Sequence, residues 1–223
     1  MDTDNIEFIS LGGWCGTKIA LNKNNYLSAS YPFDYVRSSI LGVIDCFEND
    51  FTNYFPEYGS YIQDNGLYLS KCCEFHHEDI TNISTIQSFH RKIKRFKEQL
   101  NKKNVNICFL RTICLNDYDN ELKYYTQLRS AIKKSYPNLS FIICFIITKQ
   151  FYTTYYKNLD DKTFIFVIKN DKVHGDHKYL KEQYSYIFNF IINNNLFMHI
   201  PPSKELHMIK RNNYLETFGL LHT

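Results

Sequence analysis

A cysteine follows directly behind a glycine-rich turn near the start of the chain, in the stretch EFISLGGWCGTKIAL. Residues 5–11 have the apolar pattern of a buried strand, and residues 15–23 have helical spacing. Cys15 would therefore lie beyond the carboxyl end of a strand and at the N-terminus of a helix. Backbone N–H groups and the positive end of the helix dipole lower a thiol pKa there and supply oxyanion donors. Cys15 is therefore a candidate nucleophile.

Three glycines could shape the site around this cysteine. Gly12, Gly13 and Gly16 would let the backbone turn sharply and let a substrate approach closely, because glycine has no side chain. The alternative is that Cys15 only packs beneath the sheet, as a small buried side chain.

One arginine is a candidate for substrate binding. Arg111 ends a predicted strand at 105–111, at the edge of the sheet where the site would lie. Its planar guanidinium suits an anionic substrate group. An ion pair with Asp117 or Asp119 is the competing interpretation.

Several motifs follow the cysteine in a fixed order along the first half of the chain. They are SLGGWC (10–15), SYPFDY (30–35), IDCFENDF (44–51), FHH (75–77), HRKIKRF (90–96) and FLR (109–111). This series resembles an uncharacterised bacterial and viral family described as papain-like cysteine peptidases. Members show S-L-G-x-x-C, then P-F-D-W, then E-N-D-F, then F-x-H. This chain differs in having Tyr35 where tryptophan is usual.

The resemblance implies a cysteine peptidase or related acyl hydrolase that works through a thioester and needs no cofactor. A cysteine hydrolase needs a base and a group that orients the base. His77 matches the family histidine best, with His76 as the alternative. Asp34 of the P-F-D segment is the expected orienting carboxylate, and Glu78 or Asp79 would be next. The expected partner is a protein or peptide substrate.

Two clusters could instead bind a metal. Cys72, Cys73, His76 and His77 offer zinc ligands within six residues. Adjacent strand residues point to opposite faces, so at most one of the two cysteines would converge with the histidines. The HGDH loop at 174–177 is more simply a solvated turn. We therefore predict no metal site.

The pattern of elements predicts the fold class. The predicted strands are 5–11, 67–73, 105–111, 139–148 and 164–169, and the predicted helices are 15–23, 84–100, 120–134, 179–193 and 203–221. A further helix is predicted to carry Ile40, Leu41, Ile44 and Phe47, with Ser38 or Ser39 as its cap. Buried strands that alternate with amphipathic helices favour an α/β fold, with a mainly parallel sheet and helices on both faces. The alternative is a papain-like α+β fold, in which a helix packs against an antiparallel barrel. We expect one domain over residues 1–223.

Net charge and the length of the apolar runs bear on whether the protein binds nucleic acid or a membrane. The chain has 22% charged residues and a net charge of +3, which is too small to predict a nucleic-acid partner. The basic stretch at 87–103 also carries an apolar stripe, so it is expected to be a helix with one buried face. The longest apolar run, Phe141–Ile147, is too short to insert in a membrane.

The seven cysteines, without a secretory signal pattern, predict reduced thiols and an intracellular location, cytoplasmic by preference with the nucleus as the alternative. Only three alanines occur, whereas tyrosine and phenylalanine number 18 each, which is typical of AT-rich genomes such as those of some large DNA viruses. A second functional hypothesis is a non-catalytic interaction protein, such as a viral factor, that binds a host component (a host protein, for example) through the same cleft. Phe151–Tyr156 is interpreted as part of a packed helix.

Overall fold

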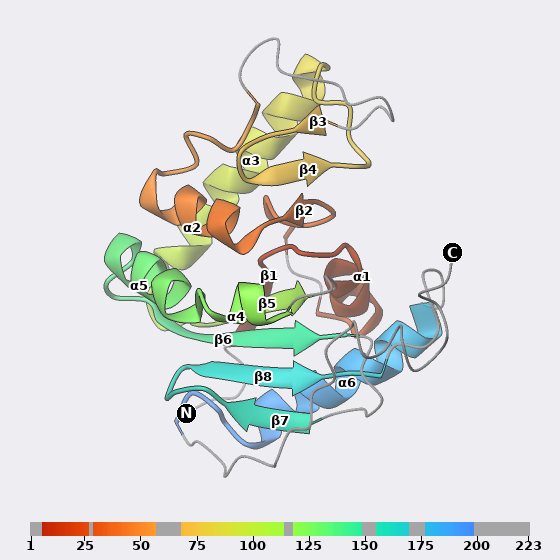
Figure 1. The fold of residues 1–223 in the computed structure, drawn as a ribbon, viewed down its shortest axis with the longest axis vertical. Coiled ribbons are helices and arrows are strands. Elements are labelled where there is room, and N and C mark those ends of the chain that lie inside the picture. Colours follow the sequence, from red (N-terminus) through yellow and green to blue (C-terminus); the bar gives the residue numbers. More distant parts are fainter. Residues whose placement is uncertain are drawn as a thin grey trace.

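Four parallel strands and one antiparallel edge strand form the central sheet (Figure 1). The structure is a computed structural model that describes residues 6–26, 29–56, 68–113, 118–148, 155–169 and 177–198. In spatial order the strands are β1 (Ile6–Ser10), β5 (Asn106–Ile113), β6 (Ser140–Ile147), β8 (Thr163–Val167) and β7 (Tyr155–Asn158). Only β7 runs antiparallel to its neighbour. The prediction of a mainly parallel sheet is confirmed.

Helices cover both faces of this sheet, as predicted (Figure 1). Alternate residues of a strand face opposite sides, so Ile9 and Phe109 join one core whereas Phe8 and Cys108 join the other. The first core includes residues of α2 (Ile40–Glu48), α3 (Ile83–Leu100) and α5 (Tyr125–Ser135). The second includes residues of α1 (Gly16–Lys23) and α6 (His177–Asn193). The architecture is therefore three-layered around a parallel sheet rather than a helix against an antiparallel barrel.

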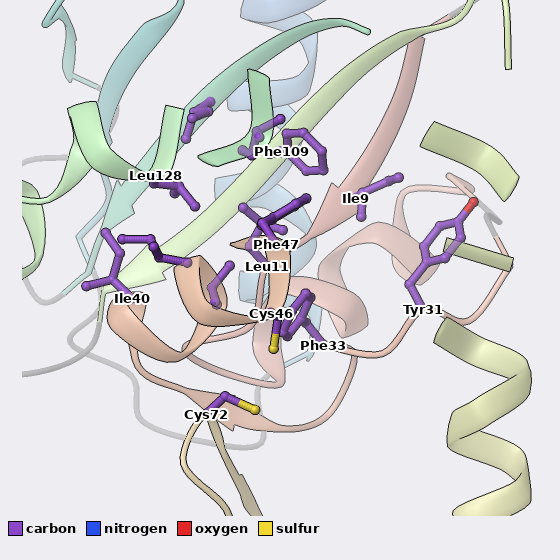
Figure 2. Packing of buried hydrophobic residues seen from close by; sticks show 14 of the residues in the cluster. Ile9, Leu11, Tyr31, Phe33, Ile40, Cys46, Phe47, Cys72, Phe109 and Leu128 are labelled. Carbon is purple, nitrogen blue, oxygen red and sulfur yellow. The ribbon is translucent and has the colours of Figure 1, made fainter. Parts of the chain in front are cut away.

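Aromatic side chains bring the sequence motifs together in the first core (Figure 2). Phe96 of α3 is fully buried, and its ring lies 5.9 Å from Phe33 and 5.7 Å from Phe51, measured between centroids. Phe33 belongs to the P-F-D motif and Phe51 to the E-N-D-F motif. The phenylalanines of these three motifs therefore pack against one another, and this packing holds the segments around Phe33 and Phe51 against helix α3.

A second, smaller sheet lies beside α2 and α3 (Figure 1). It contains β2 (Arg37–Ser38), β4 (Cys73–Phe75) and β3 (Tyr68–Leu69), all antiparallel. The single strand predicted at 67–73 is wrong, because the chain turns between β3 and β4. The backbone N–H of Ser70 donates to the carbonyl of Cys73 at 2.8 Å and closes that turn.

Other predicted elements differ in detail. The helix predicted at 120–134 is two helices, α4 (Tyr118–Leu122) and α5. Tyr155 and Tyr156 lie in strand β7, so the helical interpretation of that segment is wrong there. The predicted helix at 203–221 lies outside the described residues, as does the 174–177 motif except for His177, which begins α6. Among the helices that the structure describes, none is long and apolar enough to cross a membrane.

Candidate active site

The first strand and helix position Cys15 as the sequence predicts. β1 ends at Ser10 and α1 begins at Gly16, so Cys15 is the N-cap residue of the helix. Gly12 and Gly13 turn the chain between them with φ angles of 77° and 85°. These positive φ values are readily adopted only by glycine, which explains the glycine pair.

The Cys15 side chain is half-exposed, whereas the other five cysteines within the described residues are buried. The Cys15 side chain forms no capping hydrogen bond, but the backbone N–H groups of Cys15 and Gly16 act to lower the pKa of its thiol. Burial nevertheless raises the pKa of the Cys15 thiol above its usual value, because the loss of solvent outweighs the effect of these two N–H groups. The expected lowering of this pKa by the helix N-terminus is therefore wrong.

The glycines of the turn face the protein itself. A Cβ added to Gly12 would lie 2.2 Å from Ser38 Oγ, and one added to Gly13 would lie 2.1 Å from the carbonyl oxygen of Thr112. A Cβ on Gly16 would meet the ring of a nearby tryptophan. These close approaches account for all three glycines through contacts within the chain. Substrate binding at Gly12, Gly13 and Gly16 stays a prediction.

Arg111 is buried and uses all five of its N–H donors within the protein. Nε and Nη2 donate to the Glu121 carboxylate at 2.9 and 2.7 Å. Nη2 also donates to the Ser38 carbonyl at 2.6 Å, and Nη1 donates to Ser38 Oγ at 2.8 Å and to the Leu11 carbonyl at 3.0 Å. This arrangement leaves no donor for an anionic substrate. Arg111 instead ties the end of β1 to β2, and it forms an ion pair with Glu121. Asp117, one of the two aspartates considered as alternative partners, lies outside the described residues.

Asp34 lies buried against helix α1. Its Oδ2 atom accepts a hydrogen bond from the Tyr31 N–H at 2.9 Å and faces Lys18 Nζ at 3.1 Å. Lys18 is also buried, and it donates to the Ala29 carbonyl at 3.2 Å. Burial raises the pKa of the Asp34 carboxyl, and the positive charge of Lys18 opposes that rise. Asp34 thus anchors the helix that begins at the candidate nucleophile, while its Oδ1 atom is buried without a hydrogen-bond partner.

The two candidate bases lie on the small sheet. His76 and His77 directly follow β4 and are both exposed. His76 Nε2 lies 3.1 Å from Glu74 Oε2. Within the described part of the chain, no hydrogen bond joins either imidazole to the Cys15 sulfur. The structure therefore does not bring the proposed base and nucleophile into contact.

One buried lysine is influenced by the charges of both Glu78 and Asp34. Lys92 of α3 is buried, and its ammonium lies 4.0 Å from the ring centroid of Phe89. Burial lowers the pKa of Lys92, and the carboxylates of Glu78 and Asp34 oppose that shift. Glu78, next to the candidate bases, and Asp34 therefore act on the same ammonium group.

No group of three histidine, cysteine or acidic side chains within the described residues is arranged to hold a metal ion. In the zinc cluster considered above, Cys72 and Cys73 are buried whereas His76 and His77 are exposed. The four side chains therefore do not present ligands to a common point.

Comparison with known proteins bears on the family. A sequence model described as "Putative papain-like cysteine peptidase (DUF1796)" matches residues 6–66 and 65–151, which together span more than half of the chain. The chain belongs to the DUF1796 family. Neither a curated protein nor a solved structure gave a match. Membership confirms the resemblance carried by the motifs, and it places those motifs in a three-layer α/β structure.

In this DUF1796 chain Tyr35, which directly follows Asp34, is also a neighbour of the Cys15 thiol. Tyr35 is half-exposed and has a φ of 63°, which is unusual for an aromatic residue. Its hydroxyl accepts a hydrogen bond from Asn22 Nδ2 at 3.2 Å. Burial raises the pKa of Tyr35, and the nearby charges of Asp34 and Cys15 raise it further. The phenol is therefore an electrostatic neighbour of the thiol, which sequence reasoning noticed only as a departure from tryptophan.

Sequence reasoning also missed Lys18, Ser38 and Glu121. Lys18 follows Cys15 by three residues on the same helix, so its spacing offered a local signal. Ser38 and Glu121 meet Arg111 only through the fold, and no spacing in the sequence indicates that contact.

Proposed function

We propose that this DUF1796 protein is a cysteine-dependent hydrolase that cleaves peptide or related acyl bonds, with Cys15 as the nucleophile. The observation that carries the proposal is the half-exposed Cys15 sulfur at a strand-to-helix turn, facing two backbone N–H groups. Family membership supports a peptidase-type hydrolase and a protein substrate.

The raised pKa of Cys15 defines what the rest of the site must do. At neutral pH the sulfur carries its proton, so a base has to remove it as the sulfur attacks the substrate carbonyl. An S–C bond forms, and the carbonyl oxygen becomes an oxyanion that the N–H groups of Cys15 and Gly16 would stabilise. The protonated base then gives its proton to the leaving amine, and water hydrolyses the thioester.

His77 is our candidate for this base, with His76 as the alternative. Both directly follow β4, and the next residue, Glu78, raises the pKa of the same lysine, Lys92, as Asp34 does. The unpartnered Oδ1 of Asp34 could accept the second ring N–H of an imidazole that reaches it. Hydrogen bonds of catalytic groups commonly tighten only when substrate is bound.

Hydrolysis of a mixture of fluorogenic peptides tests this proposal. Cys15→Ala should abolish hydrolysis, and His77→Ala should reduce it strongly. His76→Ala is the matched control, because His76 is an exposed neighbour on the same segment. Activity that survives Cys15→Ala would refute the proposal. Loss of hydrolysis in His76→Ala but not in His77→Ala would identify His76, and not His77, as the base.

A second candidate function is non-catalytic binding of a protein partner through the same surface. The observations that favour it are the raised pKa of Cys15 and the lack of contact between that sulfur and either imidazole. If this candidate holds, Cys15→Ala keeps partner binding in a pull-down from cells, and the purified protein hydrolyses none of the peptides.

A further inference from the structure

Three cysteines that take no part in the proposed hydrolysis meet between helix α2 and the start of strand β4. Cys46 belongs to α2, Cys72 directly precedes β4, and Cys73 begins that strand. All three are buried, with at most 2% of each exposed. Figure 2 shows the sulfur of Cys46 pointing away from its helix toward Cys72.

Close packing of the two backbones brings Cys46 and Cys72 together. A Cβ added to Gly42 of α2 would lie only 2.3 Å from the Cα of Cys72. Cys46 comes one helical turn after Gly42 and therefore lies on the same face of the helix. The two thiols are therefore close neighbours, and each affects the other: the pKa of the Cys46 thiol is raised and that of the Cys72 thiol is lowered.

The Cys72 sulfur has both donors and acceptors around it. Ser70 Oγ lies at 3.5 Å, and the carbonyl oxygens of Asn53 and Tyr54 lie at 3.5 and 3.6 Å. The S–H groups of the neighbouring cysteines hold the pKa of Cys72 well below its usual range, because they donate to its thiolate. The carbonyls accept the proton when the thiol is protonated. Lys71, the adjacent residue, is exposed, so the pair lies just beneath the surface.

A second close pair of cysteines offers a comparison within the same chain. The sulfurs of Cys108 and Cys144 lie 3.6 Å apart in the middle of the central sheet, and both residues are fully buried. In the strand register Cys108 is level with Ile142 and Cys144 is level with Leu110. The two cysteines are thus offset by two residues along neighbouring strands, which separates their Cα atoms by more than a disulfide readily spans.

We propose that Cys72 and Cys46 form a redox site, in which a hydroperoxide oxidises Cys72 and Cys46 resolves the product to a disulfide. The Cys72 thiolate attacks the peroxide, so an S–O bond forms, the O–O bond breaks and the leaving hydroxide takes up a proton. The Cys46 sulfur then attacks the sulfenic acid, so the S–S bond forms and water leaves with the Cys46 proton. Two thiols and one hydrogen peroxide give one disulfide and two waters.

The product joins α2 covalently to the start of β4. It closes the chain between residues 46 and 72 into a loop, which would stabilise the folded state by restricting the unfolded chain. Neither cysteine takes part in the proposed hydrolysis, so a failure of the redox proposal would not affect the role proposed for Cys15, and the reverse also holds.

Peptide mapping of the oxidised full-length protein tests this proposal. A Cys15→Ser variant is used, so that the half-exposed thiol does not react. The folded, reduced protein is treated with hydrogen peroxide, its remaining thiols are blocked with N-ethylmaleimide in denaturant, and its peptides are identified by mass. We expect a Cys46–Cys72 disulfide, with Cys108 and Cys144 still reduced.

Two further measurements fix the order of the steps and the role of the fold. Adding Cys46→Ala should abolish the disulfide and leave a sulfenic acid on Cys72 that dimedone captures. Oxidation in denaturing urea should remove the preference for this pair. The proposal is overturned if the folded protein leaves Cys46 and Cys72 reduced, joins either one to a different cysteine, or oxidises Cys108 and Cys144 equally fast.

Discussion

Replacing Glu121 by glutamine tests whether Arg111 is a structural clamp beneath the candidate site. The change keeps the size of the side chain but removes the carboxylate that pairs with Arg111. It also places an amide NH₂ opposite one of the two guanidinium N–H groups that now bond to the carboxylate. A cation whose side chain is only 1% exposed would then lack both its counter-charge and one acceptor.

The expected cost follows from this burial. Removing one member of a buried ion pair typically lowers the free energy of unfolding by about 3–5 kcal/mol, because the remaining charge is left uncompensated. With a denaturant dependence of about 2–3 kcal/mol per molar urea, the midpoint of unfolding should fall by roughly 1–2 M. The Ser38 and Leu11 contacts would persist, and they limit the loss.

Urea denaturation followed by circular dichroism measures this change. Asp161→Asn is the matched control, because it removes an ion pair of Arg129 in which 60% of the aspartate side chain is exposed. Exposed pairs contribute about 0–1 kcal/mol, so the control should unfold close to the wild type. If Glu121→Gln also stays within about 1 kcal/mol of the wild type, the clamp interpretation of Arg111 is refuted.

Three other predictions concern the same region. Gly13→Ala should lower the free energy of unfolding by at least about 1–3 kcal/mol, because residue 13 has a positive φ and the new Cβ would lie 2.1 Å from a backbone oxygen. An unchanged urea midpoint would contradict the geometry of the turn. Lys18→Met and Asp34→Asn should each lower the free energy of unfolding by about 3 kcal/mol, since each leaves a buried charged group without its partner. The double variant should lose less than the sum of the two, and additive losses would show that the pair does not interact. Alkylation of Cys15 by iodoacetamide should rise with pH through a midpoint above that of a cysteine in an unstructured peptide, because burial raises the pKa of Cys15 and reduces the thiolate present at neutral pH. A midpoint below that of the peptide thiol would contradict this.

The local features of the site could be predicted from the sequence because short-range signals define them. The apolar run before Gly12 predicts β1, and the glycine pair predicts the turn that places Cys15 at a helix N-cap. Ser39 caps α2 by accepting a hydrogen bond from the Gly42 N–H, as expected for a serine before an apolar helix. The parallel sheet follows from the alternation of such elements.

The rest depends on contacts between distant segments, which spacing does not encode. Arg111 was assigned to substrate, and its pairing with Ser38 and Glu121 arises only when β5 enters the sheet. The sign of the Cys15 pKa shift was predicted wrongly because the helix N-terminus is a local feature, whereas the burial that outweighs it comes from the packed fold. His76 and His77 directly follow a strand, but that strand is β4 of the small sheet, and no spacing in the sequence shows how far its end lies from Cys15.

Trapping of a covalent acyl group tests the central claim most directly, because a generic activated ester can label the nucleophile even when the natural substrate is unidentified. The protein is mixed with p-nitrophenyl acetate and quenched in acid, and the modified peptide is identified by mass spectrometry. The account predicts an acetyl thioester on Cys15, with release of p-nitrophenol that the Cys15→Ala variant no longer supports. An acetyl group on any other residue, or equal release by the variant, would contradict it.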